Sequence, residues 1–223
     1  MLSEVRKIIK SIFVLFSTLI LATLATNSYF SSQAKITDNV FSTGNWTPPP
    51  QISKVVINEV YYDVAADKGA DDDGVVQSDE WVELYNPGDT SVDVRYWVLQ
   101  DASGSHQLFN TYTPIPAHGF ALISQRPSTW TLYWPGIPQG VLIIENYTKI
   151  GNGLANDGDR LILKDDHQNI VDQISYGNDT TIFNPSIPTV AKGHSIERQP
   201  AGKYTGTAAD FIDQVNPTPG LGI

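Results

Sequence analysis

From residue 51 onward, short hydrophobic runs alternate with clusters of turn-forming residues. The runs are rich in β-branched and aromatic side chains, which is typical of strands, and none shows the 3.6-residue period of an amphipathic helix. They cover residues 52–62, 79–85, 92–100, 106–109, 120–124, 141–145, 160–164, 170–176 and 194–198. A single helical turn is expected at residues 208–213. Many short strands at this spacing predict an all-β protein, and specifically a β-sandwich.

Within the predicted strands, alternation assigns side chains to faces. Val82 and Leu84 flank Glu83, so we expect both to point into the core. Trp97 lies in a stretch of alternating apolar residues, where a large aromatic side chain is best explained as a core anchor. These residues therefore receive structural roles.

The segments between the strands carry two further predictions. Asn86-Pro-Gly-Asp89 and Asn156-Asp-Gly-Asp159 have the composition of tight hairpin turns. Residues 111–138 contain five prolines, Trp130 and Trp134, which indicates an irregular segment packed by its own aromatic side chains.

The N-terminal region has the pattern of an export signal. Lys7 and Lys10 precede an uncharged apolar run at residues 12–25, and small residues follow it. A run of this length suits a signal-peptide core, whereas a membrane-spanning helix needs about 20 apolar residues. We expect a signal peptide at 1–28, a linker at 29–51 that ends in a proline-rich spacer, and the folded domain at 52–223. The open alternative is an uncleaved segment that anchors the chain in a membrane.

The sequence around the expected cleavage point supports this division. Tyr29-Phe30 follows the small residues, and Asn39-x-Phe41-x-x-Gly44 comes further on. Residues 25–46 resemble the cleavage region of camelysin-like and biofilm-fibre exported proteins of prokaryotes. The resemblance implies cleavage before Tyr29.

Composition and charge narrow the classes of partner. The absence of Cys excludes disulfide scaffolds, thiol nucleophiles and Cys-ligated metal clusters. Residues 29–223 carry 11 basic and 23 acidic side chains, a net charge of −12. Because phosphate backbones are bound by Lys and Arg, nucleic acid is not expected as a partner.

The acidic side chains are densest between the first two predicted strands. Nine carboxylates face a single basic residue, Lys68, in this interval: Glu59, Asp63, Asp67, Asp71, Asp72, Asp73, Asp79, Glu80 and Glu83. Residues 69–80 match the calcium-loop pattern except at Gly69, where the pattern has Asp. The hypothesis is a Ca²⁺ site formed by Asp67, Asp71, Asp73 and Glu80, and the alternative is a solvated acidic loop.

Catalytic constellations are not evident in the sequence. His106, His118, His167 and His194 are scattered, and no serine lies in a nucleophile elbow. Glu59 and Glu83 have the chemistry of an acid/base pair, but carboxylates at the edge of a sheet are more often surface groups or hydrogen-bonded structural groups. No catalytic residue, organic cofactor or enzymatic activity is predicted.

One resemblance extends over most of the chain. Its motifs are Val56-Ile-Asn-Glu-Val60, Asp79-Glu-Trp-Val-Glu-Leu-Tyr-Asn-Pro-Gly88, Val92-Asp-Val-Arg-Tyr-Trp-Val-Leu-Gln-Asp101, Ile115-Pro-Ala-His-Gly119, Leu154-Ala-Asn-Asp-Gly-Asp159, Asp172-Gln-Ile-Ser-Tyr-Gly177, Gly193-His-Ser-Ile-Glu-Arg198, Asp210-Phe211 and Thr218-Pro-Gly220. In this order they resemble the lamin tail domain family in its prokaryotic form.

The resemblance implies an immunoglobulin-like β-sandwich of lamin tail domain type, after the N-terminal hydrophobic signal helix. In prokaryotes the family occurs in exported and surface proteins, often beside hydrolase, nuclease or adhesion modules. We therefore expect a secreted or cell-surface, non-catalytic interaction module that binds a protein or a cell-envelope polymer. The alternatives are an accessory protein for a surface hydrolase or nuclease, and a metal-dependent hydrolase that uses the acidic loop.

Overall fold

The computed structural model describes residues 55–70, 78–145 and 148–223. The predicted signal region and linker at 1–51, with Asp71 and Asp73, lie outside these residues. The described residues form two larger β-sheets, one two-stranded sheet and two short helical turns, so the all-β prediction is confirmed.

The larger sheet has six strands in the order β12-β11-β1-β2-β7-β8. The strands are β12 (Phe211–Gln214), β11 (Ser195–Arg198), β1 (Val56–Tyr61), β2 (Trp81–Tyr85), β7 (Phe120–Ser124) and β8 (Leu142–Glu145). Neighbouring strands are antiparallel except β7 and β8, which run parallel and are joined by the long segment 125–141.

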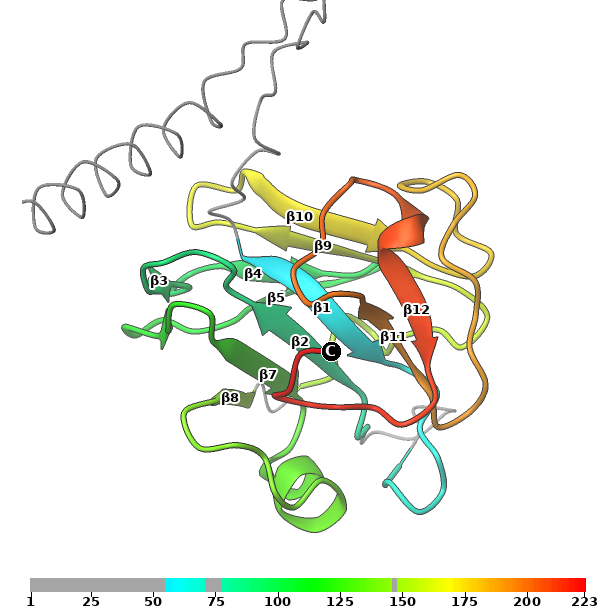
Figure 1. Ribbon diagram of the computed structural model, residues 1–223, viewed down its shortest axis with the longest axis horizontal. Coiled ribbons are helices and arrows are strands. Elements are labelled where there is room, and N and C mark those ends of the chain that lie inside the picture. The colour runs from blue at the N-terminus through cyan, green and yellow to red at the C-terminus, as the bar shows by residue number, and fades with distance from the viewer. Residues whose placement is uncertain (1–54, 71–77, 146–147) are drawn as a thin grey trace, which may run out of the picture. The chain divides into compact units, whose positions relative to one another are not determined.

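The second layer is a four-stranded antiparallel sheet in the order β10-β9-β4-β5. Its strands are β10 (Ile170–Ser175), β9 (Arg160–Lys164), β4 (Val98–Gln100) and β5 (Ser105–Gln107). A further pair, β3 (Val92–Asp93) and β6 (Pro114–Ile115), lies at one side. Figure 1 shows how these sheets are stacked.

The main core lies between the two larger sheets. Val82 and Leu84 from β2 point into it, as predicted, and belong to the same buried cluster as Leu161 and Leu163 from β9. Trp97 joins this cluster with 8% of its surface exposed, which confirms its role as a core anchor. The two facing hydrophobic layers establish a β-sandwich, in agreement with the sequence prediction.

The opposite face of the six-stranded sheet is also covered. Tyr61 and Trp81 stack at 5.5 Å on this outer face, and Trp130 and Trp134 from the proline-rich segment pack on them. The segment includes a five-residue π-helical turn at Thr129–Tyr133. Its aromatic residues therefore pack on the sheet, and not only among themselves as predicted.

One predicted strand is divided in the structure. Residues 92–100 were expected to be continuous, but β3 and β4 belong to different sheets. Tyr96 lies between them with φ = 64°, a left-handed conformation that no strand residue adopts. The prediction was wrong because hydrophobic alternation does not reveal a change of sheet.

The two turn motifs are not hairpins either. β2 and β3 belong to different sheets, as do β8 and β9. Asn86 is fully buried, and its amide donates to the carbonyl oxygens of Thr90, Ile115 and Pro116. The first motif therefore anchors a segment that passes from one sheet to another. The composition of a turn does not reveal that one side chain will form several such hydrogen bonds.

The expected helical turn at 208–213 is shorter than predicted. A 3₁₀ turn covers Ala208–Asp210, and β12 begins at Phe211. Among the residues described by the structure, no helix has the length and hydropathy required to cross a membrane.

Candidate functional site

The carboxylates of the acidic interval do not converge where the structure describes them. Asp79 and Glu83 lie on the outer face of β2, whereas Glu80 points to the opposite side, as the pleat of a strand requires. Glu80 is buried, and both of its oxygens lie within 3.3 Å of the Leu154 amide nitrogen. Asp67 is exposed. Of the four predicted calcium ligands, only these last two are described, and they lie in different environments.

The carboxylate of Asp79 occupies the space that a side chain at residue 69 would need, where the calcium-loop pattern has Asp and this chain has Gly69. The Asp79 carboxylate accepts hydrogen bonds from the Ala70 amide and the Thr129 hydroxyl and forms an ion pair with Arg126. A Cβ atom at Gly69 would lie only 2.2 Å from Asp79 Oδ2, and Gly69 has φ = 122°. The glycine therefore permits the carboxylate to close the base of the loop.

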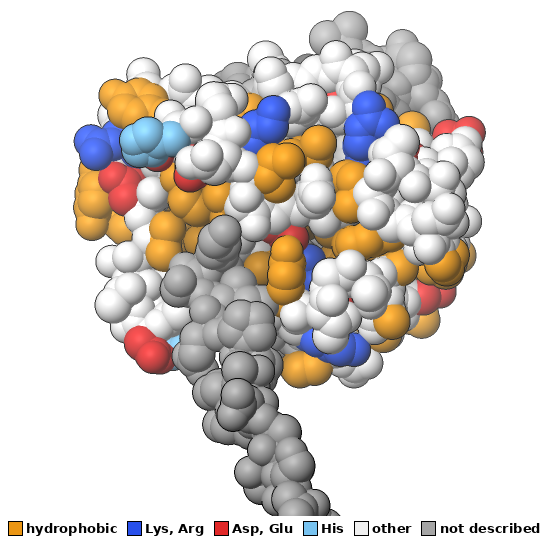
Figure 2. Space-filling view, turned by 90° about the horizontal axis from the view of Figure 1, so that it is seen from above, with side chains coloured by type: hydrophobic (Ala, Val, Ile, Leu, Met, Phe, Trp, Pro, Cys, Tyr) orange, Lys and Arg blue, Asp and Glu red, His pale blue; other side chains and the backbone are white. Residues whose placement is uncertain are grey.

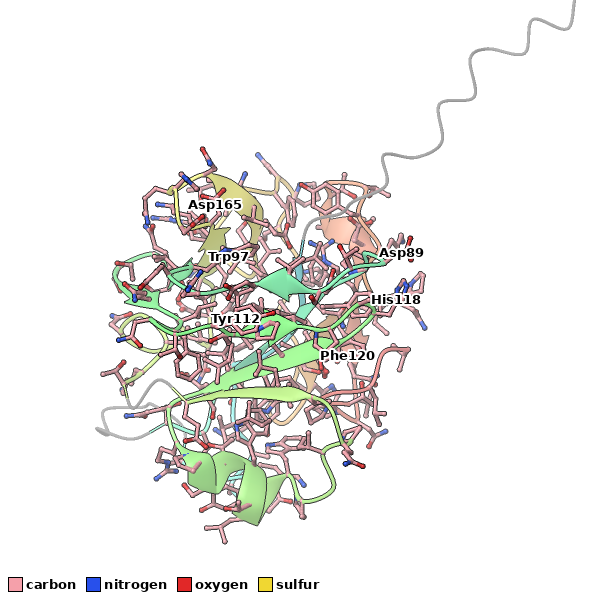
Figure 3. The ribbon with its side chains drawn as sticks, turned by 90° about the vertical axis from the view of Figure 1, so that its left-hand side faces the viewer. Asp89, Trp97, Tyr112, His118, Phe120 and Asp165 are labelled. Carbon is pink, nitrogen blue, oxygen red and sulfur yellow. The ribbon has the colours of Figure 1, made fainter. Side chains whose placement is uncertain are left out.

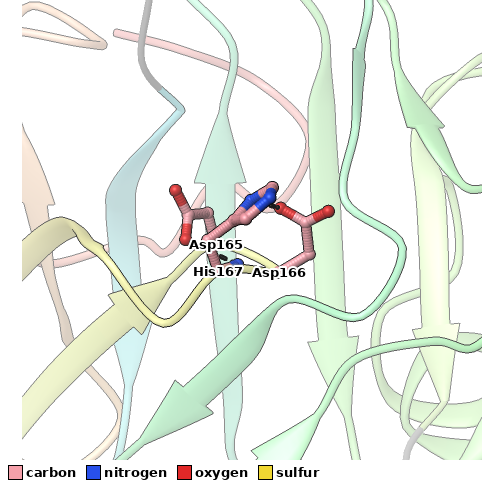
Figure 4. Close-up of side chains that lie close together, drawn as sticks. All are labelled: Asp165, Asp166 and His167. Carbon is pink, nitrogen blue, oxygen red and sulfur yellow. Dashed lines mark hydrogen bonds and ion pairs between the residues drawn. The ribbon is translucent and has the colours of Figure 1, made fainter.

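A second acidic cluster was not singled out from the sequence. Asp165, Asp166 and His167 lie in the turn between β9 and β10 (Figure 4), with potential ligand atoms within 4.8 Å of one another. However, Asp165 Oδ1 accepts the amides of His167 and Asn169, and the side-chain hydrogen bond from Asn169 is the main cause that lowers the pKa of Asp165. This arrangement is accounted for as the cap of an exposed turn.

Three glutamates form a row across the outer face of the six-stranded sheet. Glu59 on β1 is the register partner of Glu197 on β11 and of Glu83 on β2. All three residues are fully buried. This glutamate row (Glu59, Glu83 and Glu197) lies in the centre of the sheet, so the residues weighed as an acid/base pair are not solvent-facing.

The chain after β12 closes over the glutamate row. We call residues 218–223 the C-terminal strap; it crosses the sheet in front of β1 and β2 (Figure 1). The Thr218 amide donates to Glu59 Oε1 at 3.1 Å, and the Gly220 amide donates to Glu83 Oε2 at 2.6 Å. The Thr218 hydroxyl donates to Glu197 Oε2 at 3.1 Å.

Burial dominates the electrostatics of the row. Desolvation raises the pKa of Glu83 to about 8 and raises the pKa of Glu59 well above its ordinary value, with repulsion from Glu197 and Glu83 adding to the effect on Glu59. Burial likewise raises the pKa of Glu197. Such a row holds protons at neutral pH more readily than free glutamates do.

A buried ion cluster links the two sheets and unites three of the sequence motifs. Arg198 of β11, only 1% exposed, pairs with Asp172 of β10 at 3.0 Å and with Asp210 at 3.3 Å. Its Nε donates to the carbonyl oxygen of Ile57. All three charged residues are buried, so the cluster is a contact inside the fold and is not accessible to a ligand.

The described histidines do not form a catalytic arrangement. His118, His167 and His194 each lie next to an aspartate, at 3.0, 2.8 and 2.7 Å respectively. In the described part of the chain, none of the three donates to or accepts from a Ser or Thr hydroxyl. A nucleophile–base pair of the kind used in covalent catalysis is therefore not formed by these residues.

An exposed aromatic surface lies beside β3 and β6. Tyr112 and Tyr96 are 67% and 47% exposed, and the Arg95 guanidinium lies 5.6 Å from the Tyr96 ring centre. Their two segments are joined by a hydrogen bond from the Tyr96 amide to the Phe109 carbonyl. We call Arg95, Tyr96 and Tyr112 the tyrosine surface; Figure 3 shows the side of the molecule on which Tyr112 lies.

Comparison with known proteins identifies a family for this chain. The family model of the Lamin Tail Domain matches residues 48–178, more than half of the chain. This chain belongs to the lamin tail domain family. The match ends before β11 and β12, although both strands belong to the same six-stranded sheet as the matched β1, β2, β7 and β8. A comparison with curated proteins gave no match.

The lamin tail domain has an immunoglobulin-like fold of a non-catalytic interaction type, and the β-sandwich here agrees with it. A fold of this kind defines a scaffold, whereas a function depends on the surface that it presents.

Proposed function

We propose that this lamin tail domain protein is a secreted or cell-surface, non-catalytic interaction module whose partner is a protein or a cell-envelope polymer. The observation that carries the proposal is the tyrosine surface. Tyrosine and arginine are enriched at the energetically important positions of interfaces, because they combine a large apolar area with hydrogen-bonding groups.

The conformation of Tyr96 supports this assignment. A bulky residue in the left-handed region is strained, and such strain is concentrated at functional positions. The preceding residue, Arg95, and the following one, Trp97, differ in burial, since Trp97 enters the core while Arg95 and Tyr96 stay at the surface. The turn therefore exposes one aromatic side chain while it buries the next.

The distribution of surface side chains is compatible with binding. On the face seen in Figure 2, groups of hydrophobic side chains alternate with Lys and Arg side chains, and acidic ones are scattered. This face therefore does not present a continuous acidic surface, which favours a partner recognised there by apolar and hydrogen-bonding contacts.

Export rests on the sequence alone. The apolar run at 12–25 and the small residues after it support a signal peptide, and an uncleaved segment would instead hold the domain at a membrane. In either case we propose that residues 52–223 work outside the cytoplasm.

The test compares binding of the purified protein to protein and polysaccharide fractions of the cell envelope. Tyr96→Ala and Tyr112→Ala are each expected to weaken binding about tenfold or more, as interface hot spots do. Leu132→Ala is the matched control, because Leu132 is 66% exposed on the π-helical turn, away from β3 and β6. Equal binding by all three variants would refute the tyrosine surface as the interface.

A further inference from the structure

The glutamate row lacks a positive partner. Among the described residues, no Lys, Arg or His forms an ion pair with Glu59, Glu83 or Glu197. Glu59 Oε2 and Glu197 Oε1 are buried without any hydrogen-bond partner. Two buried carboxylate oxygens without a donor are costly while the groups are charged, and protonation removes that charge.

The glutamate row accepts hydrogen bonds from the neighbouring strands and from the strap. Ser195 Oγ contacts Glu59 from β11, Asn58 Nδ2 donates to Glu83 from β1, and Gln214 Nε2 donates to Glu197 from β12. The strap contributes the Thr218 and Gly220 amides, the Thr218 hydroxyl and a backbone hydrogen bond from Ile223 to Glu197. Among the described residues, the titratable groups that raise the pKa of Glu59 are Glu197 and Glu83.

The row does not have the geometry of a metal site. Within the described ranges, Asp165, Asp166 and His167 are the only set of three potential ligands whose atoms lie within 4.8 Å of one another.

The strap also packs against residues outside the row, and Pro219 and Gly220 are buried. A Cβ atom at Gly222 would lie 2.6 Å from Ala201 Cβ, and one at Gly220 would lie 2.9 Å from Val141 Cγ2. The Ala201 amide donates to the Ile223 carbonyl at 3.0 Å. Close backbone packing of this kind requires the strap to lie flat, and Leu221 remains 54% exposed.

We propose that the glutamate row and the C-terminal strap form a proton-dependent latch, which is closed while the row is protonated and opens as the row ionises. Opening admits water to the carboxylates and uncovers the outer face of β11, β1 and β2. The latch is independent of the proposed interaction function.

The size of the response follows from proton linkage. Each glutamate that is protonated under the closed strap and ionised under the open one multiplies the open-to-closed ratio tenfold per pH unit. This holds from the ordinary glutamate pKa up to the pKa in the closed state, which is about 8 for Glu83. The ratio is therefore expected to rise steeply between pH 5 and pH 8.

The experiment is residue-resolved amide hydrogen exchange of the protein at pH 5.5, 7 and 8.5, expressed as protection factors after correction for intrinsic exchange. The protection factors of the Thr218 and Gly220 amides are expected to fall at least tenfold over this range. The Leu108 amide, which donates to the Trp97 carbonyl, is the control and is expected to keep its protection.

Glu83→Gln and Glu197→Gln keep the side-chain size but cannot ionise. Each substitution is therefore expected to make the pH-dependent fall in the protection factors of the strap amides smaller by tenfold or more. Constant strap protection in the unaltered protein would overturn the proposal, as would an equal loss at Leu108, which signals global unfolding. An undiminished loss in whichever of the two variants folds would overturn it too.

Discussion

At the scale of single residues, burial has different consequences for an ionisable side chain and for an apolar one. Glu83 and Trp97 are both in strands or next to them, and both are buried, yet one is ionisable and the other apolar. Their substitution therefore tests two different physical terms, proton linkage and hydrophobic packing.

Trp97→Ala is expected to lower the free energy of unfolding by about 3–5 kcal/mol, because it removes a buried aromatic side chain and leaves a cavity. Chemical denaturation of the variant and the parent protein measures the difference. Tyr112→Ala is the control, since Tyr112 is 67% exposed and a surface substitution changes stability by about 0.5 kcal/mol or less. An equally small effect for Trp97→Ala would show that the indole does not contribute to the core.

Glu83 makes stability depend on pH. Its pKa rises from 4.5 to about 8 on folding, so both states are protonated below pH 4.5 and its stabilising effect is then complete. Between these values the unfolded state loses the proton first, and the free energy of unfolding falls by about 1.4 kcal/mol per pH unit for this one group.

Denaturation of Glu83→Gln over pH 4.5–8.5 is therefore expected to show a shallower decline than the parent protein. Asp157→Asn, a change at an exposed carboxylate whose side-chain partner is the neutral Asn178, is expected to leave the slope unchanged. Parallel curves for Glu83→Gln and the parent protein would contradict the prediction.

At the scale of elements, the covered outer face explains why hydrophobic patterns were only partly informative. All six residues of β1 are buried, because the proline-rich segment and the C-terminal strap cover the face that would otherwise be solvated. A strand of this kind places carboxylates and aromatic rings on its second face, and the sequence alone does not say what covers them.

The loop at residues 63–80 carries the calcium prediction. A site formed by Asp67, Asp71, Asp73 and Glu80 should raise the melting temperature in millimolar Ca²⁺, since extracellular modules bind at about 10⁻⁴–10⁻³ M. The stabilisation should reach about 2.7 kcal/mol at a hundredfold excess over the dissociation constant. Mg²⁺ should act much more weakly, because it dehydrates reluctantly.

Asp71→Asn/Asp73→Asn should abolish the calcium response. Asp165→Asn/Asp166→Asn removes the same charge from the turn between β9 and β10 and should leave the response intact. Equal shifts with both ions, unchanged by the first pair of substitutions, would identify the loop as a solvated acidic surface.

At the scale of the whole molecule, the export proposal rests on the N-terminal segment, and cleavage of this segment can be tested directly. We expect material secreted by the producing cells to begin at or near Tyr29, because small residues precede it and the cleavage-region resemblance points to that bond. N-terminal sequencing of the extracellular fraction measures this. Ser28→Leu should reduce cleavage, and an intact Met1 in the extracellular protein would contradict the prediction.

The sequence by itself determined the fold class, most strand positions and the core role of Trp97, because alternation and turn residues are local signals. It also indicated the family, since its motifs recur in order along the chain. Only the tertiary structure showed that Tyr96 turns the chain from one sheet to another, and that Arg198 pairs with Asp172 and Asp210. It alone aligned Glu59, Glu83 and Glu197 beneath the strap, because these contacts join residues up to 159 positions apart. Strand register and sheet order decide such encounters, and neither is written in local hydrophobic patterns.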